Sequence, residues 1–357
     1  MNGGLGLRRA AKNGALLVAS LAAGLAFAEL GAWALHRGAY PYLNLFVADA
    51  RYGVRLMPSA STRVRSRDGR VTDLTTGSLG FRGPEWPLEA PQGERVLLLG
   101  DSQVMGYGVP FESAMGEALG RLTGAEVLTA AVPSWGPNES ALALEDLGPD
   151  FRPTQVVFVA NAANDWYERL PNTQRTSARD GWATLPGAEA SHDFFGRGWL
   201  LGRSHLVLAG RQLLRFIGTA EHPSAVMPQR LARDVERLRG EPSPVSTALA
   251  RVVEACRGLS CRVVAVALPL DAQVSAAEWQ KYRATPVDLT GSEALLDDFV
   301  EDARARGVPA RSLLGPLRAA GPGMFLPDDY HLSAAGHAVV AAALHELTLR
   351  SGAEVRR

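Results

Sequence analysis

The sequence predicts an α/β fold: a doubly wound parallel five-stranded sheet between helical layers, preceded by a transmembrane helix at the N-terminus. Short apolar runs alternate with helix-type patterns from residue 95 onward, as expected when parallel strands are buried on both faces. One longer apolar run lies near the N-terminus. The 357 residues suffice for one large domain with insertions or for two small domains.

The longer apolar run covers residues 14–35, which are 22 residues with Glu29 as the only charge. As a helix it would be about 33 Å long, enough to cross a hydrocarbon core of about 30 Å. Arg8, Arg9 and Lys12 precede it, and positive residues of this kind stay in the cytoplasm. We therefore expect a single-pass anchor in the inner (cytoplasmic) membrane, with the catalytic domain in the periplasm.

A cleaved signal peptide is the alternative interpretation, because Ala26, Phe27 and Ala28 fit a signal-peptidase site. The apolar residues continue past this site to Leu35, which favours the uncleaved anchor. In either case the body of the chain is exported.

The pattern after the anchor predicts three further segments. Residues 36–76 are polar and weakly patterned, which is typical of a linker or stalk or of an edge segment. Residues 77–357 form the sheet-bearing domain, and residues 166–242 form an insertion in it because they are too long for a simple crossover. The strands are expected at residues 95–99, 126–132, 155–160, 262–268 and 307–311, and the main helices at about residues 112–122, 139–147, 245–256 and 333–349.

Charge and composition exclude several classes of function. The 37 basic and 37 acidic residues cancel, which argues against nucleic acid as a partner because that calls for a basic surface. Lys12 and Lys281 are the only lysines, so phosphate-binding loops and Schiff-base chemistry have almost no lysine to use. We expect no cofactor.

Cys256 and Cys261 are the only cysteines. In an oxidising compartment they could form a local disulfide between the end of a helix and the start of a strand, and two separate buried thiols are the alternative. A zinc site that adds His331 and His337 would need a tetrahedral spacing that nothing supports, so no metal is expected.

Polar residues with catalytic chemistry follow the expected strands, where sites form in open α/β sheets. Ser102, in the sequence Gly-Asp-Ser, follows the first strand, and Asn164 follows the third. Asp328 and His331 precede the last helix. A serine nucleophile needs a base, and the base needs a carboxylate that orients it. Each motif alone also fits a helix cap, but together they indicate a catalytic site.

These motifs resemble those of the SGNH (GDSL-type) hydrolase superfamily over residues 77–349. Residues 96–110, Val-Leu-Leu-Leu-Gly-Asp-Ser-Gln-Val-Met-Gly-Tyr-Gly-Val-Pro, are similar to the first block of that family. Residues 162–165, Ala-Ala-Asn-Asp, are similar to the third block, and residues 328–337 to the fifth. Residues 78–82, Ser-Leu-Gly-Phe-Arg, together with the anchor, are similar to membrane-tethered bacterial members.

The resemblance implies a flavodoxin-like fold and a role for each matched residue. Ser102 would be the nucleophile, His331 the base and Asp328 its carboxylate, with Asp329 as the second choice. Asn164 would donate to the oxyanion.

The family's second block supplies a glycine whose backbone N–H completes the oxyanion hole. By the best alignment Ser134 stands at that position, and Gly136 follows two residues later. Either amide could serve. Ala162 replaces the usual glycine of the third block, which could narrow the site.

The insertion is rich in aromatic residues, which would form either an ordinary core or a stacking surface for a sugar ring or acyl chain. These residues are Trp166, Tyr167, Trp182, Phe194, Phe195 and Trp199. A helical pattern at residues 199–217 carries Arg203, Arg211 and Arg215, and we favour core packing for it over contact with the membrane. His337 is expected to be structural, and His192, His205 and His222 have no partner that the sequence identifies.

Together these features predict a serine esterase that hydrolyses O-acyl esters of a small molecule or glycan at the cell envelope. An O-acyltransferase acting on an envelope polysaccharide could use the same residues, and it would need a membrane acyltransferase as partner. An inactive scaffold that binds glycans or proteins is the third hypothesis, against which the intact Ser102, Asp328 and His331 argue.

Overall fold

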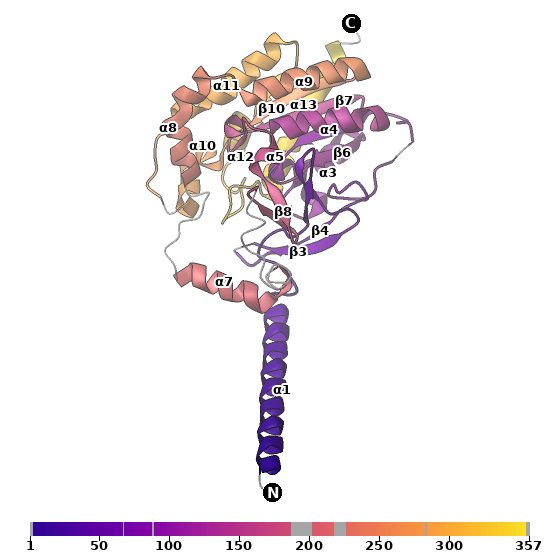
Figure 1. The fold of residues 1–357 in the computed structure, drawn as a ribbon. Helices are drawn as coiled ribbons and strands as arrows, with labels where there is room; N and C mark the ends of the chain where they lie inside the picture. The colour runs from indigo at the N-terminus through magenta and orange to yellow at the C-terminus, as the bar shows by residue number, and fades with distance from the viewer. Residues whose placement is uncertain are drawn as a thin grey trace.

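A long N-terminal helix leads into an α/β domain, and the two termini lie at opposite ends of the molecule (Figure 1). The computed structural model describes residues 3–66, 68–87, 89–186, 202–217, 226–282 and 284–354.

Five parallel strands form the central sheet: β5 (Arg95–Gly100), β6 (Glu126–Ala131), β7 (Gln155–Asn161), β10 (Arg262–Leu268) and β11 (Ala310–Ser312). Their order is β11-β10-β7-β5-β6. The chain therefore adds β6 on one side of β5 and then crosses to the other side, which is the flavodoxin-like order. Every residue of β5 and β7 is buried. The predicted doubly wound five-stranded sheet is confirmed.

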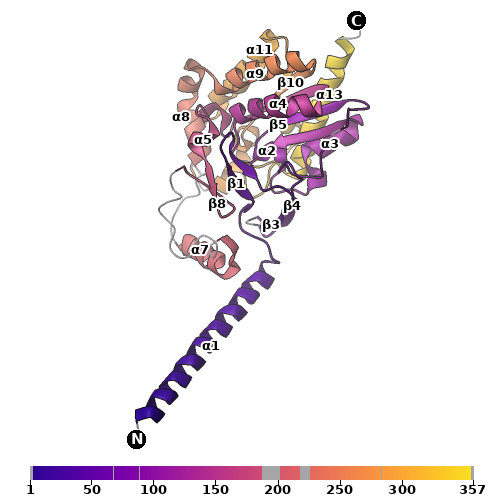
Figure 2. The ribbon, with the colours of Figure 1, turned by 45° about the vertical axis from the view of Figure 1, so that its right-hand side comes forward.

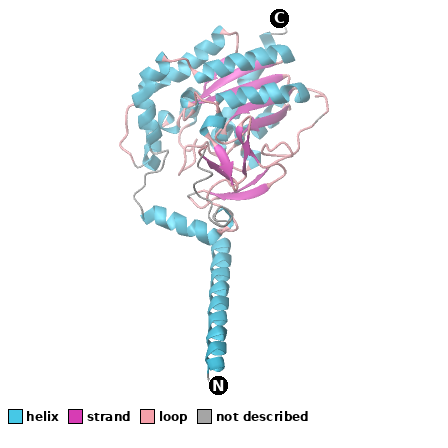
Figure 3. Ribbon diagram, in the orientation of Figure 1, coloured by secondary structure: helices cyan, strands magenta, loops and turns pink. Residues whose placement is uncertain are grey.

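Helices cover both faces of this sheet (Figure 3). On one face α4 packs along α9, and α9 contacts α11; on the other face α3 packs along α13, which also contacts α12. Their bounds are α3 (Met115–Thr123), α4 (Pro137–Phe151), α9 (Pro244–Leu259), α11 (Thr290–Ala305), α12 (Leu314–Ala320) and α13 (Ala334–Glu354). Short elements fill the connections: α2 (Ser102–Met105), α10 (Asp271–Val274) and the 3-10 helices η1 (Phe111–Ser113), η2 (Asp165–Tyr167) and η4 (Ala276–Tyr282).

The segment 36–76 is not the linker or stalk that we expected. It forms two antiparallel hairpins, β1 (Phe46–Asp49) with β2 (Gly53–Leu56) and β3 (Ser61–Arg65) with β4 (Val71–Thr75). Val54 and Leu56 are fully buried in the same core as the sheet. The indole N–H of Trp135 donates to the carbonyl of Val54 at 2.7 Å. Apolar residues at alternate positions are enough to dock a polar strand onto a domain.

The elements of the expected insertion, residues 166–242, pack in three different places, of which the contact of residues 205–217 with the N-terminal helix is described below. The elements α5 (Asn172–Arg175), β8 (Ser177–Arg179) and β9 (Trp182–Thr184) pack beside β1 and β2, whereas α8 (Met227–Gly240) packs on α11. Trp166 is buried in the main core. His192, Phe194, Phe195, Trp199 and His222 lie outside the described residues. The predicted helix at residues 199–217 is observed as α7 (His205–Ile217).

The N-terminal helix α1 (Gly3–Leu35) projects from the domain as a single rod (Figures 1 and 2). Its part from Ala11 to Leu35 is long and apolar enough to cross a membrane. Its apolar side chains, such as Leu17 and Phe27, are exposed.

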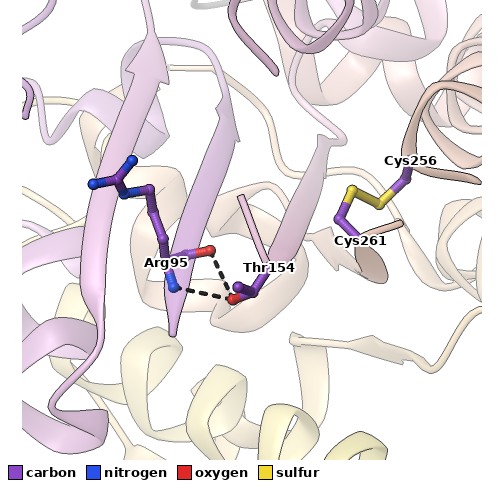
Figure 4. Close-up of a disulfide and its surroundings, with 4 residues drawn as sticks. All are labelled: Arg95, Thr154, Cys256 and Cys261. Atoms are coloured by element: carbon purple, nitrogen blue, oxygen red, sulfur yellow. Dashed lines mark hydrogen bonds between the residues drawn. A yellow bond between two sulfur atoms is a disulfide. The ribbon is translucent and has the colours of Figure 1, made fainter. Parts of the chain in front are cut away.

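The two cysteines are joined. Cys256 in the last turn of α9 and Cys261, next to the start of β10, form a disulfide (Figure 4). Nearby, the amide of Arg95 donates to the Thr154 hydroxyl, and that hydroxyl donates to the carbonyl of Arg95. Both features lie at the amino-terminal ends of the strands, whereas the site described next lies at their carboxyl ends.

Candidate active site

Ser102 lies in a tight turn between a buried strand and a helix. β5 ends at Gly100, where an added Cβ would come within 2.3 Å of a Val104 methyl group, so a larger residue could not form this turn. The Asp101 carboxylate accepts the amide N–H of Gln103 at 2.9 Å and caps α2. Ser102 is the first residue of that helix and is 9% exposed. The turn therefore presents its hydroxyl beyond the carboxyl end of the strand.

His331 lies directly opposite this hydroxyl. Its Nε2 is 2.8 Å from the Ser102 Oγ, and the ring is held between Tyr107 and Tyr330, with centroid distances of 4.9 and 4.4 Å. His331 is only 6% exposed. When Nδ1 carries the ring proton, Nε2 accepts the hydroxyl proton of Ser102, which is the geometry of a general base.

The carboxylate that contacts the base is Asp329. Its Oδ1 is 2.8 Å from Nδ1 of His331 and also accepts the backbone N–H of His331 at 3.4 Å. Our assignment of this role to Asp328 is wrong. An aspartate favours hydrogen bonds to the residue two positions on, as in an Asx turn, and Asp329 has that spacing from His331 whereas Asp328 does not.

Asp328 instead holds the turn between β3 and β4. Its Oδ2 accepts the amide N–H of Asp68 at 3.0 Å, and Arg70 Nη2 lies 3.7 Å from its Oδ1. The two neighbouring carboxylates thus have different tasks. Asp329 acts on the ring of His331, and Asp328 ties the hairpin to the same loop.

The environment of Asp329 keeps it ionised. Burial by itself would raise the pKa of this carboxyl, but the charge of His331, the ring contact and the amides of Tyr330 and His331 together hold the pKa below its ordinary value. An ionised carboxylate is what a histidine base requires, because it stabilises the imidazolium formed on proton transfer.

Of the two candidate backbone donors, only Ser134 remains available. The amide of Gly136 donates to the side chain of Glu139 (Oε2) at 3.1 Å, at the start of α4. The assignment of Gly136 to the oxyanion hole is therefore wrong. Ser134 has a φ of 76°, a conformation that favours glycine, and this agrees with its alignment to a family glycine. Within the described residues, the Ser134 amide donates no hydrogen bond.

Asn164 is linked to the nucleophile turn through Asn161, which sequence reasoning missed. The Asn161 amide donates to Asp101 Oδ2 at 2.9 Å and to Asn164 Oδ1 at 3.0 Å. The Asn164 amide donates to Asp165 Oδ1 at 3.2 Å, and its side chain also interacts with the carboxylate of Glu168. A polar residue directly after the apolar run at residues 156–160 was the available signal for Asn161.

Two further residues hold the base and were not predicted. Gln103 donates to the carbonyl of Tyr330 and accepts the amide N–H of Leu332, both at 3.0 Å. Its side chain therefore binds the backbone on both sides of His331. Lys281 donates to the carbonyls of Leu326 and Asp329 at 2.9 and 2.8 Å. These are contacts to backbone atoms across long sequence distances, and no local motif signals them.

Buried acids lie beneath the oxyanion side of the site. Burial raises the pKa of Asp101 and of Asp165, and it raises the pKa of Glu168 to about 7. Arg175 approaches Glu168 Oε1 at 3.0 Å, while Glu168 Oε2 is buried without a hydrogen-bond partner among the described residues. Burial therefore favours the neutral form of each of these carboxyls.

The remaining predicted residues have structural surroundings. His337 is fully buried and accepts the amide N–H of Met115 at 3.2 Å, and burial lowers the pKa of its ring to about 3. His205 stacks on Tyr40 at 4.7 Å. No group of three His, Cys, Asp or Glu side chains suited to a metal occurs among the described residues.

Comparisons with known proteins find similar folds among solved structures. No protein-family model matches the chain, and no curated protein matches it. The psychrotrophic esterase EstA from Pseudoalteromonas sp. is 12% identical, with a TM-score of 0.37 over 72% of this chain and 98% of its own. The acetyl xylan esterase AlAXEase is 13% identical, with a TM-score of 0.39 over 70% and 97%.

A GDSL-like lipase from Bacteroides thetaiotaomicron is 12% identical, with a TM-score of 0.40 over 74% of this chain and 93% of its own. Several of these structures are described as SGNH or GDSL proteins, the superfamily that the sequence motifs resemble.

Proposed function

We propose that this chain is an SGNH-type serine esterase that hydrolyses O-acyl esters. One observation carries the proposal: two 2.8 Å contacts run from the Ser102 hydroxyl through the ring of His331 to Asp329. They supply a nucleophile, a base and an orienting carboxylate in one line.

In the first half of the reaction, His331 Nε2 removes the hydroxyl proton as Ser102 Oγ bonds to the ester carbonyl carbon. The imidazolium, stabilised by Asp329, then gives this proton to the departing alcohol oxygen as the ester C–O bond breaks. In the second half, water attacks the acyl-serine with the same base, and the carboxylic acid leaves with Ser102 restored.

The oxyanion of both halves would be bound by the amides of Ser102 and Ser134 and by the carboxamide of Asn164. The positive φ of Ser134 and the Asn161 bridge to Asn164 support these assignments. Each well-placed donor contributes about 3–4 kcal/mol to transition-state stabilisation.

We further propose an acylated small molecule or glycan as the substrate, at the outer side of the inner membrane. The rings of Tyr107 and Tyr330 beside His331 support a substrate with an apolar or sugar-ring surface. The apolar helix α1 and the positive residues before it support the anchored topology.

Covalent labelling tests the esterase proposal. A fluorophosphonate should label the wild-type protein at Ser102, and Ser102→Ala should abolish labelling while a circular dichroism spectrum shows intact folding. Ser113→Ala, which changes a serine in the nearby 3-10 helix η1, is the matched control and should label normally. Labelling that persists in Ser102→Ala would overturn the assignment.

Turnover separates the remaining hypotheses. Release of acid from p-nitrophenyl esters supports an esterase, whereas acyl transfer to an added glycan without net hydrolysis would support the acyltransferase. A folded wild-type protein that reacts with neither the probe nor any ester would leave the inactive scaffold.

A further inference from the structure

The helix α7 packs against α1 at the base of the domain. Of all the described elements, α1 is the one that α7 contacts most extensively. Both ribbon views place α7 across the end of α1 that is nearest the domain (Figures 1 and 2). The expected core packing holds for Leu208, which is 6% exposed, and not for Leu213, which is 59% exposed.

A carboxylate of α1 holds the start of α7. Glu29 accepts the hydroxyl of Ser204 at 2.6 Å and the amide N–H groups of His205 and Leu206 at 2.7 and 3.0 Å. The first amides of a helix lack partners within the helix and attract negative charge. The one charged residue of the apolar segment is thus neutralised by the end of another helix.

The position of Glu29 along α1 sets the depth of α7. It lies six residues before Leu35, where α1 ends, which is about 9 Å along the helix axis. A bilayer is about 30 Å thick in hydrocarbon and about 40–45 Å with its headgroups. If Leu35 reaches the outer edge of the headgroups, Glu29 lies near the boundary between headgroups and acyl chains.

The surface chemistry of α7 suits this boundary. Leu213 is 59% exposed, and Leu206, two helical turns earlier on the same face, is partly exposed. The sequence of residues 202–217 contains no acidic residue and includes Arg211 and Arg215. An apolar face combined with basic residues is typical of helices that lie in the interface of an anionic membrane.

We propose that α7 is an interfacial membrane helix whose partner is the outer surface of the lipid bilayer, attached to the transmembrane helix through Glu29. This inference rests on the proposed anchor topology and is independent of the proposed chemistry. The chain then contacts the bilayer through two helices joined at one carboxylate, one crossing the membrane and one lying on it.

Depth-dependent fluorescence quenching tests the proposal in the full-length chain. A Leu213→Cys variant offers one free thiol, because Cys256 and Cys261 are paired. It is labelled with the dye NBD in vesicles of phosphatidylcholine and phosphatidylglycerol, and spin-labelled phosphatidylcholines are then added. We expect blue-shifted emission and stronger quenching by a label high on the acyl chain than by one at its end.

The matched control is Leu122→Cys. Leu122 is 49% exposed and lies at the end of α3, close to the amino-terminal end of β6. Its dye should show neither the shift nor quenching. A second variant adds Glu29→Ala to Leu213→Cys, and quenching at position 213 should fall while the chain stays with the vesicles.

Equal, weak quenching at positions 213 and 122 in chains that stay with the vesicles would overturn the interfacial helix. Chains that do not stay with the vesicles would overturn both this inference and the anchor. Fluorophosphonate labelling of Ser102 in the same samples reports separately on the proposed esterase.

Discussion

At the scale of single residues, the loop before the last helix carries two neighbouring carboxylates with separate tasks. Asp329 contacts the ring of His331, whereas Asp328 accepts the amide of Asp68 in the β3–β4 turn. Both residues are close to the base along the chain, so their substitution distinguishes a direct electrostatic role from a supporting one.

Asp329→Asn should lower kcat about 10⁴-fold, because an amide can donate to Nδ1 and favour the wrong ring tautomer. Asp328→Asn keeps the contact between Asp329 and His331 and should lose far less. Initial rates on a short p-nitrophenyl ester give both values. A larger loss in Asp328→Asn would restore the sequence-based assignment.

Glu168 predicts a pH dependence of stability. Burial raises its pKa from 4.5 to about 7, so the unfolded chain releases this proton at lower pH than the folded protein does. Stability is then fully present below about pH 4.5 and is lost as the pH rises through 7. A rise of this size in the pKa changes the free energy of unfolding by at most about 3 kcal/mol.

Glu168→Gln should remove this loss, so the free energy of unfolding should fall less between pH 5 and pH 8 in the variant than in the wild type. Urea unfolding at the two pH values measures it. The charge of Glu168 also raises the pKa of Asp165, so the variant removes the titration of Glu168 together with its effect on that neighbour. Parallel pH profiles would contradict the prediction.

At the scale of elements, local residues explain where helices begin and end. The helix expected at residues 139–147 runs from Pro137 to Phe151, because proline suits the first helical position and Arg152 takes a left-handed conformation with φ of 47°. The helix expected from residue 112 starts at Met115 instead, after the 3-10 turn η1.

The packing of α13 on α3 depends on His337, which lies between them. His337→Ala should destabilise the fold by about 2–4 kcal/mol at pH 7, because it leaves a cavity and removes the acceptor of the Met115 amide. Urea unfolding measures this cost.

The same substitution should cost less in acid. The ring pKa is lowered by burial from 6.5 to about 3, so as the pH falls below 6.5 the unfolded histidine gains a proton that the folded one does not. At pH 5 this removes about 2 kcal/mol from the wild type and nothing from the alanine variant. A gap between the two proteins that is constant from pH 7 to pH 5 would show that the ring titrates normally.

At the scale of the whole molecule, the Cys256–Cys261 disulfide should contribute about 2 kcal/mol, because it closes only a short loop. Replacing both cysteines by serine should lower the urea midpoint modestly. Ester turnover should not change, since the bond lies at the amino-terminal ends of the strands and Ser102 lies beyond their carboxyl ends. Intact mass after alkylation without reductant should show no added group in the wild type. Two added groups would mean that the thiols are free.

The anchored topology predicts the behaviour of the complete chain. A reporter fused after Arg357 should be active only when it is outside the cytoplasm, and the full-length protein should fractionate with membranes. A soluble, shortened product would instead indicate cleavage after Ala28. A cytoplasmic reporter signal would contradict export altogether.

Sequence alone determined the features that depend on local pattern. Apolar runs identified the central strands β5, β7 and β10, since a strand buried on both faces is largely apolar. The last strand was expected at residues 307–311 and lies at Ala310–Ser312. The positions of Ser102 and His331 followed from motifs at the ends of such strands. A disulfide between Cys256 and Cys261 was one of two interpretations, with two separate thiols as the other, because a five-residue spacing allows the bond without requiring it.

Only the tertiary structure decided what depends on contacts between distant segments. Residues 36–76 dock on the core, where the backbone carbonyl of Val54 accepts the indole N–H of Trp135, 81 residues away. Asp328 accepts the amide N–H of Asp68, 260 residues away, and Glu29 caps a helix that begins 176 residues later. Such contacts are chosen by the geometry of the folded chain, because a polar group takes whichever partner the fold brings within hydrogen-bonding distance.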